Sequence, residues 1–223
     1  MGDVTRQSNG KIMRCRWVAV GVGLLISASA IESSQAPAPL NDAEVEAAIA
    51  AGQGRLSKEL FVQCSARAGS SLSYENRRRA LQVTVFGPRG RIATLASEAK
   101  RRYETFATTS VDPGMRERAL FVEVAPQDDI DMRYLPPPIE KVVLKSKSGG
   151  DSATVVQPAD LTLDQVSFGN LLGAKTERNR GLARFDGASV ASMPAGDILV
   201  AVVTPAGEHT CTVNRGAVMS LLR

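Results

Sequence analysis

Residues 81–90 read Leu-Gln-Val-Thr-Val-Phe-Gly-Pro-Arg-Gly, an alternating strand pattern over 81–86 that stops at a Gly-Pro-Arg-Gly turn. Beyond the turn, apolar side chains recur at helical spacing, at Ile92, Leu95, Ala96, Ala99 and Tyr103. Glu98 with Arg102 and Lys100 with Glu104 are four residues apart, a spacing that supports a helix. The stretch therefore predicts a strand followed by an amphipathic helix near 90–105, and so a chain that mixes both element types.

Short β-rich runs separated by turn residues dominate the chain from Ala119 onward. They cover residues 120–125, 139–145, 154–157, 161–168, 182–185, 198–204 and 210–213. Their close spacing is typical of an antiparallel sandwich or barrel. The turn at 204–208 predicts a hairpin that places His209, Cys211 and Val213 on one face of the last strand.

Residues 41–64, which precede the strand and helix described first, are expected to form another helix and another strand. Asn41 or Asp42 can cap a helix that Gly52 and Gly54 end, and residues 60–64 form a short strand candidate. The fold class predicted is α+β, with N-terminal helices and a few strands over 41–118, followed by an antiparallel β-sandwich-like portion over 119–223. The two portions can also form one domain.

The first 30 residues have the three regions of a secretory signal peptide. Basic residues precede an uncharged run over 17–30 that ends in the small-residue triplet Ala28-Ser29-Ala30. This run is shorter than the roughly 20 residues that a membrane-spanning helix needs, so a permanent anchor is the weaker alternative. We expect cleavage after Ala30, a flexible tether over 31–40, and a secreted or periplasmic protein without a stable membrane anchor.

Only two cysteines, Cys64 and Cys211, follow the expected cleavage site. In an exported chain such a pair predicts one disulfide, and two buried free thiols are the alternative. The same region holds one histidine and no tryptophan, which excludes multi-histidine metal sites within one chain. No cofactor or metal is predicted.

Some fragments suggest catalysis or calcium binding but lack the companion residues. Gly150-Asp151-Ser152 and the Ser97 to Lys100 spacing look like serine-hydrolase motifs without the rest of the catalytic set. The acidic run at 128–131 lacks the glycine and distal glutamate of a calcium-binding loop. A hydrolase that uses His209 as a general base remains one alternative.

A basic tract over 77–102 is the clearest positive signal in the sequence. It contains Arg77, Arg78, Arg79, Arg89, Arg91, Lys100, Arg101 and Arg102, opposed only by Glu98. The tract predicts a site for an anion, and the alternative is a solvated surface on which helical periodicity spreads the charges.

Most of these patterns lack a catalytic set, so the sequence favours a non-enzymatic role. We expect an exported binding or structural protein of the bacterial envelope or extracellular space, whose partner is another envelope protein or an anionic ligand. An anion-binding module built on the basic tract and a hydrolase built on His209 are the alternatives.

Overall fold

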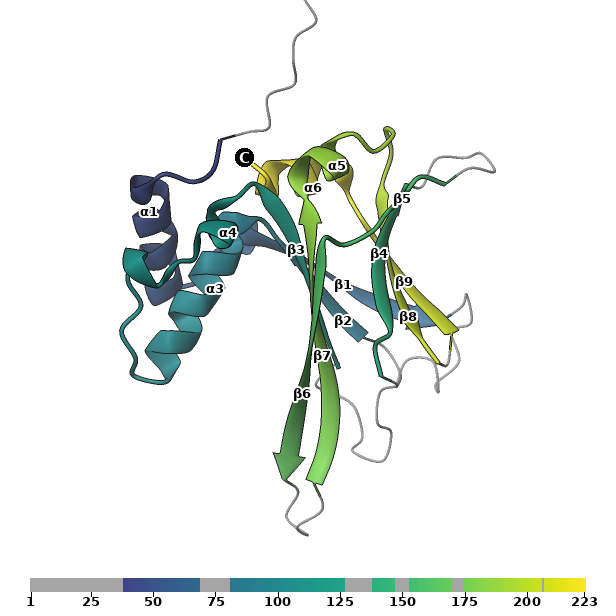
Figure 1. Ribbon diagram of the computed structural model, residues 1–223, viewed down its shortest axis with the longest axis horizontal. Coiled ribbons are helices and arrows are strands. Elements are labelled where there is room, and N and C mark those ends of the chain that lie inside the picture. Colours follow the sequence, from purple (N-terminus) through teal and green to yellow (C-terminus); the bar gives the residue numbers. More distant parts are fainter. Residues whose placement is uncertain (1–37, 69–80, 127–137, 147–152, 170–174, 206) are drawn as a thin grey trace, which may run out of the picture. The chain divides into compact units, whose positions relative to one another are not determined.

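Strands from both halves of the chain build a single antiparallel sheet in the computed structural model (Figure 1). The structure describes residues 38–68, 81–126, 138–146, 153–169, 175–205 and 207–223. The strands are β1 (Phe61–Ala68), β2 (Leu81–Phe86), β3 (Ala119–Pro126), β4 (Lys141–Ser146), β5 (Val155–Val156), β6 (Asp160–Gly169), β7 (Lys175–Asp186), β8 (Ile198–Thr204) and β9 (Gly207–Val213). Their order is β5-β4-β8-β9-β1-β2-β3-β7-β6. The two strands from the first half of the chain, β1 and β2, therefore lie at the centre of the sheet.

The sheet curls into a half-barrel, and its inner face holds the main hydrophobic core. On β2 the alternate residues Leu81, Val83 and Val85 point inward and are almost completely buried. Val200 and Val202 of β8 reach the same core from the other half of the sheet. The period-two pattern of the sequence thus separates an inner apolar face from an outer face.

The two halves of the sheet meet where β1 pairs with β9. Among the described residues, the pairs across this seam are Arg67 with Thr210 and Ala68 with His209. By contrast, β1 pairs with β2 along the whole length of β2. Cys64 and Cys211 form a disulfide beside the seam, with Cα atoms 6.0 Å apart. The predicted disulfide is confirmed, and it crosslinks the strands where their backbone pairing is short.

Two longer helices, α1 (Asp42–Gln53) and α3 (Pro88–Arg101), pack against each other outside the sheet. Asn41 caps α1: its side chain accepts a bond from the Glu44 amide at 3.0 Å, and Glu44 reciprocates. Gly52 permits the close contact, because a Cβ there would lie 2.1 Å from the Ala93 carbonyl oxygen. A small apolar core of its own joins the two helices.

The remaining described helical segments are short and lie before the first strand, between strands or after the last one. They are the α-helices α4 (Pro113–Arg116), α5 (Gly187–Ala191) and α6 (Arg215–Leu221) and the 3₁₀ turns η1 (Lys58–Leu60) and η2 (Thr108–Ser110). Val190 of α5 and Val218 of α6 are fully buried in the main core. No helix in the described part of the chain is long and apolar enough to cross a membrane.

The α+β class predicted from the sequence is confirmed, but the β-rich portion is not a clear sandwich. Because β1 bonds to both β2 and β9, the two halves are joined into one curled sheet rather than lying as separate layers. The strand predicted over 81–86 and the hairpin around 204–208 are found as expected. His209, Cys211 and Val213 share the buried face of β9.

Candidate functional site

The basic tract does not form one continuous basic surface in the described residues. Arg77, Arg78 and Arg79 lie outside the described residues. Arg89 pairs with Glu44 of α1, the Lys100 ammonium donates to the Gln53 carbonyl at 2.5 Å, and Arg102 pairs with Glu104 at 3.0 Å. Arg91 also has an interaction partner. Several charges of the tract are therefore engaged within the protein, and they lie on different sides of α3.

Glu44 shows why Arg89 belongs to the framework of the fold. It accepts bonds from Arg89 and, at 3.2 Å, from Arg118, and it also accepts a bond from the Asn41 backbone. These bonds, led by the one from Arg89, lower the pKa of Glu44 to about 2. The cluster joins α1 to the start of α3 and to the segment before β3.

The side chain of His209 lies in the interior of the fold. It is 0% exposed, on the face of β9 that also carries Cys211. A general base has to reach a substrate in an accessible pocket, so this position argues against a hydrolase built on His209. Ser97 and Lys100 lie within α3, while 150–152 and the acidic run at 128–131 lie outside the described residues. Within the described part, no cluster of three or more histidine, cysteine or acidic side chains has metal-binding geometry.

The outer face of the sheet has a polar row and an apolar row of side chains. Backbone register places Gln63 of β1 opposite Thr84 of β2, and Thr84 opposite Glu123 of β3. The neighbouring row contains Phe61 and Phe86, whose rings make an edge-to-face contact with centroids 6.5 Å apart. The polar row is a feature that a protein core would not contain.

Helix α3 begins against this outer face and runs away from it (Figure 1). At its first turn Gly90 permits close approach, because a Cβ there would lie 2.1 Å from the Leu60 carbonyl oxygen. Further along, Thr94, Glu98 and Arg101 fall at helical spacing and face the polar row. The divergence of helix and sheet leaves a groove with a volume of about 390 Å³. We call it the α3 groove.

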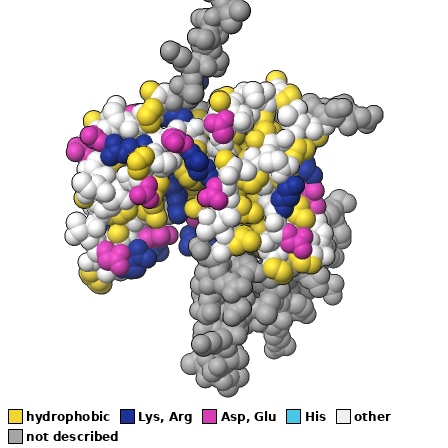
Figure 2. Space-filling model, viewed as in Figure 1, with side chains coloured by type: hydrophobic (Ala, Val, Ile, Leu, Met, Phe, Trp, Pro, Cys, Tyr) yellow, Lys and Arg dark blue, Asp and Glu magenta, His cyan; other side chains and the backbone are white. Residues whose placement is uncertain are grey.

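The lining of the α3 groove comes from α3, from β1, β2, β3 and β7, and from the segment before β1. It consists of Leu56, Phe61, Gln63, Gln82, Thr84, Phe86, Thr94, Glu98, Arg101, Glu123, Ala125 and Arg180. The volume lies within the range of about 300 to 1,000 Å³ that is typical of small-molecule sites. Figure 2 shows acidic and basic side chains close together on the surface between the helices and the sheet.

Arg180 of β7 crosses the α3 groove between sheet and helix. Its Nε and Nη2 donate to Glu123 Oε1 at 2.9 and 2.5 Å, and Nη2 lies 3.6 Å from Glu98 Oε1. Partial burial acts to lower the pKa of Arg180, but attraction to Glu123 and Glu98 outweighs burial and raises it. By contrast, Arg101 has no hydrogen-bond or ion-pair partner among the described residues. The α3 groove is thus lined by one guanidinium that is paired with carboxylates, that of Arg180, and one that is not, that of Arg101.

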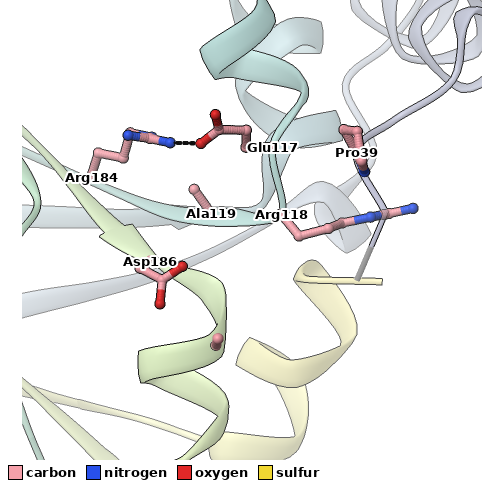
Figure 3. A pocket seen from close by; sticks show the side chains of 7 residues that line it. Pro39, Glu117, Arg118, Ala119, Arg184 and Asp186 are labelled. Carbon is pink, nitrogen blue, oxygen red and sulfur yellow. Dashed lines mark hydrogen bonds and ion pairs between the residues drawn. The ribbon is translucent and has the colours of Figure 1, made fainter. Parts of the chain in front are cut away.

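Two other hollows offer fewer uncommitted polar groups than the α3 groove. One is a smaller cavity of about 180 Å³. In Figure 3, Arg184 at its edge points toward Glu117, and Arg118 extends away from that pair. Bonds from the hydroxyl and amide of Ser189 lower the pKa of Asp186 at its edge. The other is an open hollow along α1, lined by four alanines together with Asn41, Glu44, Leu60 and Arg89. Neither brings uncommitted polar groups together as the α3 groove does.

Comparison of the chain with protein-family models, with curated proteins and with solved structures gives no match. Of the basic tract, Arg101 lines the α3 groove, and the sequence alone does not point to the other lining residues as a site. The spacing of Thr94, Glu98 and Arg101 is a signal in the sequence, but it cannot show which strands face that side of the helix.

Proposed function

We propose that the chain is an exported, non-enzymatic binding protein of the bacterial envelope or extracellular space, and that the α3 groove is its ligand site. The observation that carries this proposal is the polar row of the outer sheet face beneath a helix that diverges from it. Such a row is open to a ligand only because α3 does not cover it.

The chemistry of the α3 groove suits binding better than turnover. Its charged groups are two guanidiniums and two carboxylates, and Glu123 is already engaged with Arg180. The described lining contains no histidine, cysteine, serine or lysine. Its two hydroxyls are already bonded within the protein: Thr84 accepts a bond from Gln63, and Thr94 donates to the Gly90 carbonyl. Amides, hydroxyls and guanidiniums instead supply donors and acceptors that fix a ligand's orientation.

Export is supported by the N-terminal sequence pattern and by the disulfide. Disulfides persist in oxidising compartments such as the periplasm and the extracellular space. The order of basic residues, apolar run and small-residue triplet is typical of a cleaved leader. Mass spectrometry of the protein purified from the culture medium or periplasm tests this part, since cleavage predicts an N-terminus at Ile31.

A groove-filling substitution tests the ligand site. The full chain, with its disulfide formed, is screened by thermal shift against a library of metabolites, peptides and oligosaccharides. We expect Ala125→Trp, which fills the α3 groove, to abolish the stabilisation by any hit. Thr212→Trp, at an exposed position of β9, is the matched control and should leave it unchanged. Hits that stabilise the Ala125→Trp variant as strongly as the unaltered protein would refute the proposal.

A further inference from the structure

The charges in the α3 groove are balanced but unequally engaged. Arg180 and Glu123 satisfy each other through two bonds to one carboxylate oxygen. Glu98 touches Arg180 only at 3.6 Å, and its side chain is 25% exposed. Arg101 is exposed and has no partner among the described residues. The Arg101 guanidinium is therefore available to a ligand, and the Glu98 carboxylate, which pairs with Arg180 through Oε1, can accept further bonds through its second oxygen.

Glu98 and Arg101 lie three residues apart on the same face of α3. At that spacing, Cβ atoms are about 5–6 Å apart. Even so, no ion pair between them is found in the described residues, and both line the same cavity. A negative and a positive group side by side in one groove complement a ligand that carries both charges at a similar separation.

The remainder of the α3 groove adds an apolar wall and hydrogen-bonding groups. Leu56, Phe61 and Phe86 form the wall, where an aliphatic side chain would leave water. The side-chain amides of Gln63 and Gln82 can bond to a peptide group, because each supplies both donors and an acceptor.

We propose that the α3 groove binds a zwitterionic ligand of the amino-acid or short-peptide class with an apolar side chain, an inference that rests on the proposed function. The ligand's ammonium group is held by Glu98, and its carboxylate by Arg101. A purely anionic ligand fits less well, because Glu98 and Glu123 line the same space. A sugar fits less well because the described lining contains neither tyrosine nor tryptophan.

Three related dipeptides measured by calorimetry separate the two charge contacts. They are leucyl-leucine, its N-acetyl form, which lacks the ammonium, and its C-terminal amide, which lacks the carboxylate. The pH is kept below the ordinary pKa of an α-amino group. We expect leucyl-leucine to bind the full chain at least about tenfold more tightly than either blocked form, because hydrogen bonds to charged groups are the stronger ones.

Two variants assign each charge to its partner. Arg101→Gln should bind leucyl-leucine and its amide equally while still discriminating against the acetylated form. Glu98→Gln should show the reverse pattern. The matched control is Arg102→Gln, because Arg102 is the next residue of the chain, pairs with Glu104 and does not line the groove. Thermal unfolding of each variant verifies that it is folded.

The outcomes separate this inference from the proposed function. Equal binding of all three dipeptides, no binding at millimolar concentration, or equal loss in both Arg101→Gln and Arg102→Gln would overturn the zwitterion assignment. If other library compounds still lose their binding in Ala125→Trp, the α3 groove remains the ligand site with a different ligand class. If no compound depends on Ala125, both proposals fail.

Discussion

Removing the disulfide should destabilise the protein strongly, because it closes a long loop. Cys64 and Cys211 are 147 residues apart in the sequence. In the chain-entropy model a loop of that length contributes about 5 kcal/mol by restricting the unfolded state. Typical domains have an unfolding free energy of about 5–15 kcal/mol, so a Cys64→Ala/Cys211→Ala variant should be marginally stable.

Urea denaturation of the oxidised protein and of this double variant measures the loss directly. Hydrogen exchange should show which strands are destabilised. The described residues pair over only a short stretch across the β1–β9 seam, whereas β2 and β3 pair along the whole of β2. We expect faster exchange in β1 and β9 than in β2 and β3. A loss below about 1 kcal/mol, or two free thiols in the protein secreted under oxidising conditions, would refute the reasoning.

Two further changes test the framework around the α3 groove. Glu44→Gln breaks the contacts with Arg89 and should cost about 1 kcal/mol at neutral pH. Because folding lowers the pKa of Glu44 from 4.5 to about 2, this difference should be full above about pH 4.5, shrink as pH falls, and vanish below about pH 2. Unfolding curves at several pH values check it, and a pH-independent difference would contradict it. Gly90→Ala should lower the melting temperature by several degrees, because the new Cβ meets the Leu60 carbonyl. Gly114→Ala, with nothing within 4 Å of the new Cβ, is its control, and equal melting temperatures would be the contrary result.

Local patterns predicted individual elements well, because the signals that define them are local. The alternation at Leu81, Val83 and Val85 required one buried face, and the chain forms β2 there. The helix after it begins within the predicted turn, since Pro88 and Gly90 are compatible with a first helical turn that Gly87 precedes. The disulfide was predictable for a similar reason, because only one pairing is possible between the two cysteines that follow the expected cleavage site.

The order of the strands in the sheet depends on contacts between distant parts of the chain, so it could not be inferred from local patterns. Nothing in the sequence of β1 shows that it bonds to β2 on one side and to β9 on the other, yet these contacts make one curled sheet out of two expected portions. The α3 groove has the same origin. Gln63, Glu123 and Arg180 are separated by long stretches of sequence, and only the strand order brings them under α3.

The basic tract illustrates why the role of a charge depends on where its side chain points in the fold. Arg89 and Arg101 lie in the same helix, but Arg89 faces Glu44 of α1 and Arg101 faces the α3 groove. Charge density along the chain does not report direction, because successive residues of a helix point about 100° apart. The partners of each charge in the folded protein determine whether it serves stability or binding.

The most direct test of the ligand site is a nuclear magnetic resonance titration of the isotopically labelled protein with the tightest compound from the screen. We predict that the largest amide shifts fall on the residues that line the α3 groove from both sides, on β1, β2 and β3 and on α3 around Glu98. Shifts centred on the alanine-rich surface of α1, or around Arg184 and Asp186, would show that the α3 groove is not the binding site.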